Sequence, residues 1–253
     1  SMLHKINKIK SFAVLIMCLG AADLMGQAIV NIEELRREGE IGFFTNISAG
    51  LDASRGNRDR DYYSLRIRFD NNSEDAESFL ILQQTERKSN DIVMDKSKFI
   101  HGRYIFIGED TFHWEVFAQY SENPFRNYKK RSVLGGGLRF ELSKSGRLGA
   151  GLLNEEETDL SGKSKITERL GFYFHTDFDI AENISFDPTI YFQPSIENFE
   201  NDYKASMILA LDFKVNENFK ITMQYSSFYD SDPPLLAEKT DESISTMFSY
   251  NLN

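Results

Sequence analysis

Apolar and polar residues alternate one by one through most of the chain after residue 42. In the segment 43–54, the odd positions are mostly apolar and the even positions mostly polar. Successive side chains of a β-strand point to opposite faces, so this pattern predicts strands with one apolar face. The alternation recurs at 63–70, 112–121, 134–142, 169–180, 203–213 and 243–252. Weaker patterns at 79–85, 99–107, 148–153, 184–194 and 219–227 bring the total to about twelve strands, and bacterial single-chain membrane barrels have an even number.

Strand and loop lengths favour a membrane barrel over a soluble one. The predicted strands hold about 11 to 13 residues, enough to cross a bilayer at a tilt and longer than the usual globular strand. Most connections expected at one end are short, and those at the other end are longer, at 87–96, 154–165, 195–201 and 230–241. We therefore predict an all-β fold, a transmembrane antiparallel up-and-down β-barrel with its apolar face outside. The alternative is a secreted soluble barrel with its apolar face inside.

The first residues have the features of an export signal. Ser1 before Met2 is interpreted as an expression scar, and three lysines precede an apolar run at 12–22. Small residues support a cut after Ala28 or an earlier one at 20–22. We assign 1–28 to the scar and signal peptide, 29–41 to a short charged segment that could plug the barrel, and 42–253 to the barrel. Cys18 lies within the apolar run rather than at its end, which argues against a lipid anchor.

Composition excludes several classes of protein. The run at 12–22 is far shorter than the roughly 20 apolar residues of a membrane-spanning helix. The net charge of −10 repels a phosphate backbone, so no nucleic-acid partner is expected. A single cysteine excludes zinc-finger, iron–sulfur and disulfide scaffolds.

Charged residues of both signs fall on the face predicted to line the lumen. The candidate lumen-charge network is Arg66, Arg68, Arg103, Glu115, Arg131, Arg139, Glu141, Arg169, Asp177 and Asp179. Unpaired charges in a partly dry lumen are costly, so opposite signs should meet. We favour a network that fills and stiffens the barrel over a pore with a charged constriction.

The sequence predicts no catalytic residue, cofactor or metal. His101, His113 and His175 fall on the predicted lumen face, but at depths that should keep them apart. The alternative is an enzyme at the barrel rim, with His175 or His101 as its base.

Acidic residues gather in two predicted external loops. One holds Asp230, Asp232, Glu238 and Asp241, and the other covers 155–159. Such carboxylates could bind Ca²⁺ or bridge lipopolysaccharide through divalent ions. A solvated acidic surface is the simpler interpretation.

Three segments are similar to a known family. They are 29–33 (IVNIE), 131–139 (RSVLGGGLR) and 229–234 (YDSDPP), the last followed by Lys239-Thr240-Asp241. With the closing alternating strand, they resemble the salt-induced outer membrane protein family, the YdiY-like proteins, a domain of unknown function. The resemblance implies an outer-membrane barrel of a Gram-negative bacterium and carries over no established activity or catalytic motif.

Together these features predict a function without catalysis. We expect a narrow passive channel or an envelope-stabilising barrel linked to salt or osmotic stress, located in the bacterial outer membrane. Its expected partners are membrane lipid, lipopolysaccharide and the barrel-assembly machinery, and its oligomeric state is left open. The alternatives are an enzyme at the rim and a soluble barrel that binds a small ligand.

Overall fold

A computed structural model of the chain describes residues 40–252, apart from 55, 57, 58, 109, 110, 144, 235 and 236. The expected signal peptide and residues 29–39 of the expected plug segment lie outside the described residues. None of the helices in the described part of the chain is long and apolar enough to cross a membrane.

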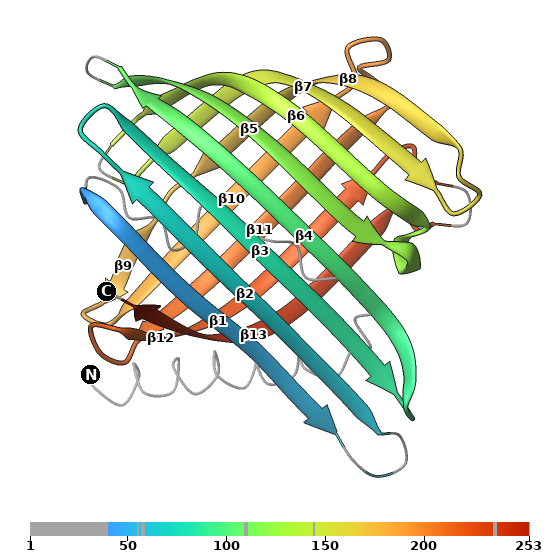
Figure 1. Cartoon of the computed structure of the whole chain (residues 1–253), viewed down its shortest axis with the longest axis horizontal. Helices are drawn as coiled ribbons and strands as arrows, with labels where there is room; N and C mark the ends of the chain where they lie inside the picture. Colours follow the sequence, from blue (N-terminus) through green and yellow to red (C-terminus); the bar gives the residue numbers. More distant parts are fainter. Residues whose placement is uncertain are drawn as a thin grey trace, which may run out of the picture.

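The described chain folds as an antiparallel β-barrel (Figure 1). Each strand pairs with its sequence neighbours, except that β8 and β9 do not pair with each other, and β1 pairs with β13, so the sheet closes. Because β8 and β9 both pair with β10, they form one interrupted strand in a twelve-stranded wall. The predicted antiparallel barrel is confirmed. Its elements are β1 (Gly42–Ser54), β2 (Arg60–Asn72), β3 (Ala76–Ser89), β4 (Ile92–Ile107), β5 (Phe112–Asn123), η2 (Pro124–Arg126), β6 (Tyr128–Glu141), β7 (Arg147–Asp159), β8 (Ser164–His175), β9 (Phe178–Ala181), β10 (Ile184–Pro194), β11 (Tyr203–Lys214), β12 (Phe219–Asp230) and β13 (Thr240–Leu252).

Two prolines explain why the pairing between β8 and β10 is short. Proline has no backbone N–H and cannot donate to a ladder. Pro188 lies beside the break between β8 and β9, where its carbonyl accepts a hydrogen bond of 3.2 Å from the Thr176 N–H. Pro194 is the last residue of β10. Beyond it, only the isolated bridge between Arg169 and Ser195 pairs β8 with the chain that follows β10. The β8–β10 ladder therefore runs only from Phe192 to Thr189 on β10.

The connections at the two ends differ less in length than the sequence predicted. We call the end where β1 finishes the loop end, and the end where β1 begins the terminal end. At the loop end, Asn90 and Asp91 alone connect β3 to β4, both with positive φ, as a two-residue hairpin requires. Residues 160–163 connect β7 to β8. The expected long loops at 87–96 and 154–165 are therefore wrong, whereas 195–202 and 231–239 are long connections.

The two faces of the wall have the polarity of a membrane barrel. On β2, the inward Arg66 and Arg68 are 2% and 0% exposed, while Leu65 on the outer face is 47% exposed. Most buried side chains are polar or charged, and large apolar side chains lie on the outside. A soluble barrel has the opposite arrangement, so this polarity disfavours the soluble alternative.

Candidate functional site in the barrel lumen

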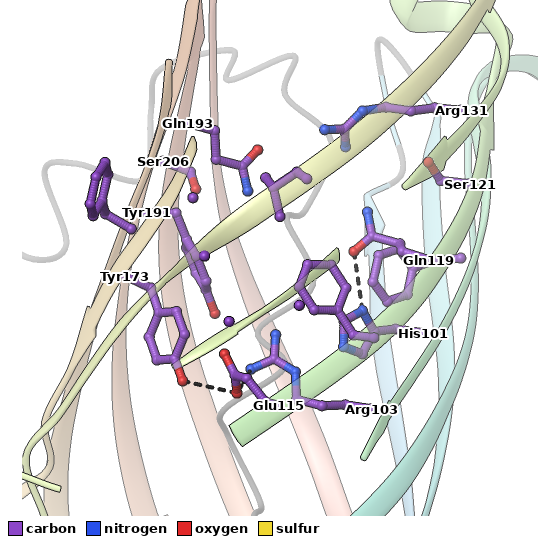
Figure 2. Close-up of a pocket in the computed structure, with 18 of the residues that line it drawn as sticks. His101, Arg103, Glu115, Gln119, Ser121, Arg131, Tyr173, Tyr191, Gln193 and Ser206 are labelled. Carbon is purple, nitrogen blue, oxygen red and sulfur yellow. Dashed lines mark hydrogen bonds and ion pairs between the residues drawn. The ribbon is translucent and has the colours of Figure 1, made fainter. Parts of the chain in front are cut away.

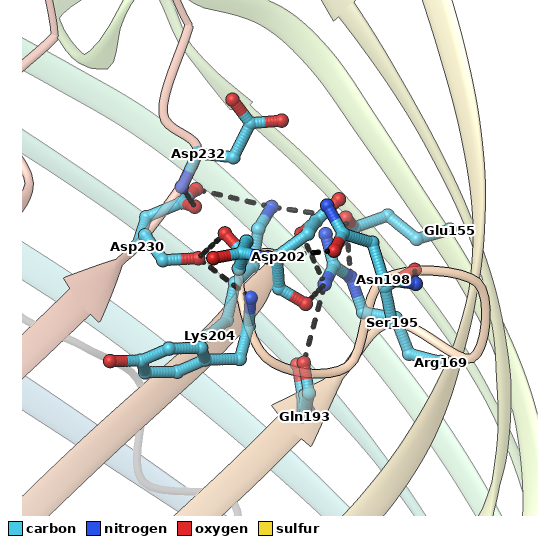
Figure 3. Close-up of polar contacts among 12 residues, drawn as sticks. Glu155, Arg169, Gln193, Ser195, Asn198, Asp202, Lys204, Asp230 and Asp232 are labelled. Carbon is cyan, nitrogen blue, oxygen red and sulfur yellow. Dashed lines mark hydrogen bonds and ion pairs between the residues drawn. The ribbon is translucent and has the colours of Figure 1, made fainter.

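A network of buried ion pairs lies at the loop end of the lumen, with Glu155 of β7 at its centre (Figure 3). Glu155 accepts hydrogen bonds from Arg131 Nε at 2.6 Å and Arg169 Nε at 3.1 Å. Lys204 Nζ lies 3.0 Å from the same carboxylate. These three cations come from β6, β8 and β11, so one carboxylate links four strands.

The network extends across the gap where β8 and β10 do not pair. Arg169 lies 2.8 Å from Asp202, and Lys165 lies 3.1 Å from Asp202 and 2.7 Å from Asp232. Lys204 also pairs with two further acids, Glu157 at 3.1 Å and Asp230 at 3.5 Å. Side-chain ion pairs therefore join strands at a place where the backbone ladder is interrupted.

At the terminal end of the lumen, two arginines pair within their own strands. Arg68 donates to Asp70 of the same strand, with Nε to Oδ2 at 2.9 Å and the second guanidinium nitrogen to Oδ1 at 2.8 Å. Arg139 Nε donates to Glu141 of its own strand at 2.6 Å. In both pairs the partners are two residues apart, so they share a face and lie along the wall. Other ion pairs at this end join neighbouring strands, with Lys220 of β12 2.6 Å from Asp212 of β11 and Arg147 of β7 3.7 Å from Glu141 of β6.

A polar and aromatic layer lies between these two groups of ion pairs, and Figure 2 shows its residues Arg103, Glu115 and Tyr173. Arg103 of β4 donates to Glu115 of β5 at 3.1 Å. The Tyr173 hydroxyl of β8 donates to the same carboxylate at 3.2 Å, across the lumen from β5. The Arg103 guanidinium also lies 5.0 Å from the centre of the Phe117 ring, a cation–π distance.

An apolar contact narrows the lumen at the same depth. Phe79, Ile81 and Ile105 form a buried cluster on β3 and β4, and Tyr191 packs against it. Tyr191 comes from β10, five pairings away from β4 around the barrel wall. Strands so far apart in sheet order face each other across the lumen, so side chains form a constriction.

A cavity lies on the loop-end side of this constriction. It has a volume of about 170 Å³, and its walls include Phe99, Phe117, Tyr173, Gln193 and Ser206. A second cavity of about 230 Å³ lies nearer the 231–239 connection. The two cavities share three lining residues, Tyr128, Arg131 and Phe228, so they adjoin.

Glycines on β6, β7 and β8 leave the space for this cavity. A Cβ at Gly149 would lie 1.9 Å from the Tyr173 ring, and one at Gly135 would lie 2.5 Å from the Phe117 ring. Glycine therefore lets both rings lie flat against the barrel wall. The sequence shows these glycines, but the rings that cover them belong to neighbouring strands. Sequence reasoning missed this part of the site for that reason.

Most members of the candidate lumen-charge network line the lumen, as the contacts above show. Arg66 donates to Gln83 at 2.8 Å. The exceptions lie toward the terminal end. The Asp177 side chain is 46% exposed and 4.0 Å from His175. Asp179 is exposed and has no ion pair within the described part of the chain.

The three histidines make separate contacts. His101 Nδ1 is 3.2 Å from the Gln119 amide oxygen, and the ring stacks on Phe79, Phe99 and Phe117. His175 Nδ1 is 2.8 Å from the Thr189 hydroxyl. His113 accepts a hydrogen bond from the Gly108 N–H at 3.1 Å. Among the described residues, no group of three or more histidines, cysteines or acids could hold a metal ion.

The structure corrects the expected acidic loops. Glu155 is 3% exposed within β7, not part of an external loop, because the strand continues to Asp159. Asp230 ends β12 and is 5% exposed. Asp232 lies in the 231–239 connection, where the Lys165 hydrogen bond holds the pKa of its carboxyl below the usual range. Glu238, Asp241 and Asp230 line the second cavity, near the 231–239 connection.

Comparisons with known proteins agree with this architecture. The chain matches the family DUF481, described as a protein of unknown function, over residues 47–252. A comparison with curated protein sequences finds no match. The translocator domain of autotransporter NalP from Neisseria meningitidis is similar, with a TM-score of 0.50 and 9% identity, covering 86% of this chain and 90% of that one. The NanC porin has a TM-score of 0.49 and 10% identity, covering 83% of this chain and 99% of that one.

The fold and the family match together define what kind of protein this is. At 9% identity the NalP translocator domain shows a shared fold alone. The family match spans most of the chain. The protein therefore belongs to the DUF481 family, the YdiY-like family that its motifs resemble, and it has the fold of an outer-membrane β-barrel.

Proposed function

We propose that this protein is a narrow passive channel of the bacterial outer membrane, with its loop end facing outward. The observation that carries the proposal is the pair of adjoining cavities, which extends from the loop end to the mid-lumen constriction. The barrier at the constriction is formed in part by side chains, because Tyr191 packs against the cluster of Phe79, Ile81 and Ile105. Side chains can change rotamer, so such a barrier is compatible with slow passage of small solutes.

The outer face suits a lipid environment. Large apolar side chains such as Leu134, Leu152 and Trp114 are more than half exposed there, at 66%, 60% and 56%. We propose that membrane lipid covers this belt, that lipopolysaccharide contacts the loop end, and that the barrel-assembly machinery inserts the chain. The net charge of −10 continues to argue against a nucleic-acid partner.

Single-channel recording in a planar bilayer tests the proposal. We expect the purified, heat-modifiable protein to give small discrete current steps. Tyr191→Ala should enlarge them, because it removes one side of the constriction. The matched control is Tyr104→Ala, which removes a tyrosine that is 42% exposed on the outer face. Folded wild-type and Tyr191→Ala barrels that both stay silent would exclude the channel.

The second candidate function is a filled barrel that stabilises the envelope. The network around Glu155 favours it, because a buried group that joins four strands stiffens the wall. A link to salt or osmotic stress rests on the family resemblance. Normal growth of a deletion strain at high salt, together with a silent bilayer recording, would exclude both functions.

An enzyme at the rim has less support than the channel, because the histidines that would serve as its base are buried. A general base must reach the proton that it abstracts from a substrate. His101 is 0% exposed and His175 is 3% exposed. The Thr189 hydroxyl beside His175 belongs to a residue that is 0% exposed, so it is poorly placed to attack a substrate.

A further inference from the structure

We infer that the cavity next to the constriction is a binding subsite for one neutral, hydroxyl-bearing ring of monosaccharide size. The inference deepens the proposed channel function and rests on it for the route by which the solute arrives. Three properties of the cavity carry it, namely its size and shape, its charge and its hydrogen-bonding groups.

The size and walls of the cavity suit a single six-membered ring. An apolar cavity of about 150 Å³ holds a benzene molecule, so the volume of about 170 Å³ found here admits one ring with small substituents. The rings of Tyr173 and Tyr191, whose planes are tilted by 42° to each other, line one side of the cavity (Figure 2). Gly137, Gly151 and Gly171 contribute lining without side chains. Aromatic rings beside bare backbone accommodate a saturated ring better than a branched chain.

The charges around the cavity are balanced, which argues for a neutral ligand. The cavity is lined by three permanent cations, and each has a carboxylate partner within 3.4 Å. The pairs are Lys98 with Glu122, Arg103 with Glu115, and Arg131 with Glu155. An anionic solute would have to displace one of these carboxylates, two of which are buried. A neutral solute requires no such exchange.

Polar groups on opposite sides of the cavity are available to hydroxyl groups. Gln193 of β10 and Ser206 of β11 lie on one side, and Ser121 of β5 lies on the other (Figure 2). None of these three side chains has a hydrogen-bond partner within the described part of the chain. Amide and hydroxyl groups both donate and accept hydrogen bonds, as hydroxyl groups of a ring do. A hydrocarbon ring would leave them unsatisfied at a cost.

Saturation-transfer difference NMR on the full chain in detergent micelles tests the subsite, with D-glucose as the probe. We expect saturation transfer to glucose and its loss in Ser206→Trp, which fills the cavity. The matched control is Ser227→Trp on the neighbouring strand, which places the same ring on the outer face and should bind glucose as the wild type does. Heat-modifiable migration checks that both variants fold.

A milder variant keeps the inference testable if Ser206→Trp does not fold. Gln193→Leu removes the amide at nearly constant volume and should weaken glucose binding about fivefold, the value of one neutral hydrogen bond. Two competitors test the ligand class. Glucuronate adds a charge to the ring, and tetrahydropyran removes the hydroxyl groups. Both should compete poorly with glucose.

The outcomes separate the subsite from the channel. Absence of saturation transfer, unchanged binding in folded Ser206→Trp or Gln193→Leu, or equal competition by glucuronate or tetrahydropyran would overturn the subsite. Glucose binding that follows the expected variants, combined with a silent bilayer, would support the subsite and exclude the channel. Current steps without glucose binding would support the channel and overturn the subsite.

Discussion

At the loop end of the lumen, Glu155 pairs with cations from three other strands, whereas at the terminal end Arg68 pairs with Asp70 on its own strand. Both sites bury arginine against carboxylate, so the residue chemistry is the same. The connectivity differs. Same-strand pairs fix side chains along the wall, while the loop-end network also holds strands together.

The difference coincides with the state of the backbone ladder. Around Arg68, β2 pairs with β1 and β3 along its whole length, from Arg60 to Asn72. Around Arg169, β8 has only one isolated bridge to the chain that follows β10. At this junction, charged side chains form contacts beside a gap in the backbone ladder. Elsewhere such pairs also join hydrogen-bonded strands, as Arg131 and Glu155 do on β6 and β7. We infer that the loop-end network substitutes for the ladder that Pro194 interrupts.

Glu155→Gln should have the largest effect on stability. It leaves Arg131, Arg169 and Lys204 without their shared counter-charge, and breaking a buried ion pair costs about 3–5 kcal/mol. We expect a lower urea midpoint for unfolding from lipid vesicles. The control is Glu156→Gln, the same change at the next residue, which is exposed. Equal midpoints for the two variants would contradict a structural role for the network.

Hydrogen exchange locates the effect. If the network substitutes for the ladder, Glu155→Gln should speed exchange of backbone amides in 164–169 and 195–203, beside the interrupted pairing. Amides of β2 should exchange at the wild-type rate. A uniform increase around the barrel would show that the variant lowers global stability without weakening this junction in particular.

Asp70→Asn should have a smaller effect. The change breaks one buried ion pair rather than three, and the amide oxygen keeps one of the hydrogen bonds from Arg68. The cost should therefore lie near the lower end of about 3–5 kcal/mol. The complete ladders on both sides of β2 should hold the strand in place. Asp52→Asn, at an exposed position of β1, is the control for the same chemical change. A cost as large as that of Glu155→Gln would mean that connectivity between strands does not matter.

The period of two along the chain was enough to predict the strands and their faces. Alternation of Leu65 with Arg66 needs no knowledge of neighbouring strands, since each side chain of a strand points away from the next. The inverted polarity, with the apolar face outside, was predicted from the lengths of the strands and loops. These are local properties, which is why the barrel could be predicted from a single sequence.

The centre of the loop-end network could not be found in the same way. Glu155 belongs to an acidic run with little contrast between its two faces, and such a run is typical of a solvated loop. Its partner Arg169 comes from the next strand and Lys204 from β11, and both contacts depend on the register between strands. The same holds for Gly149 beneath Tyr173. The contacts that form the candidate site depend on strand pairing, which alternation does not encode.

The exposed edge of the network should contribute least, and pH should reveal it. Asp232 is 58% exposed at its side chain and pairs with Lys165. Asp232→Asn should cost about 0.2–1 kcal/mol at neutral pH, as surface ion pairs do. Because the folded protein holds the pKa of Asp232 below the usual range, the pair stabilises the fold above the unfolded-state pKa. That contribution is lost as the pH falls through the lower, folded-state pKa.

The test compares the urea midpoints of wild type and Asp232→Asn across the acidic range. The gap between them should close at low pH, where both carry a neutral side chain at this position, and should shrink at high salt. Glu238→Gln is the control, because this exposed acid of the same connection has no ion pair within the described part of the chain. A gap that persists below the folded-state pKa would assign the effect to packing rather than to the charge on Asp232. The ion-pair network would then end at Asp202, one residue before β11 begins.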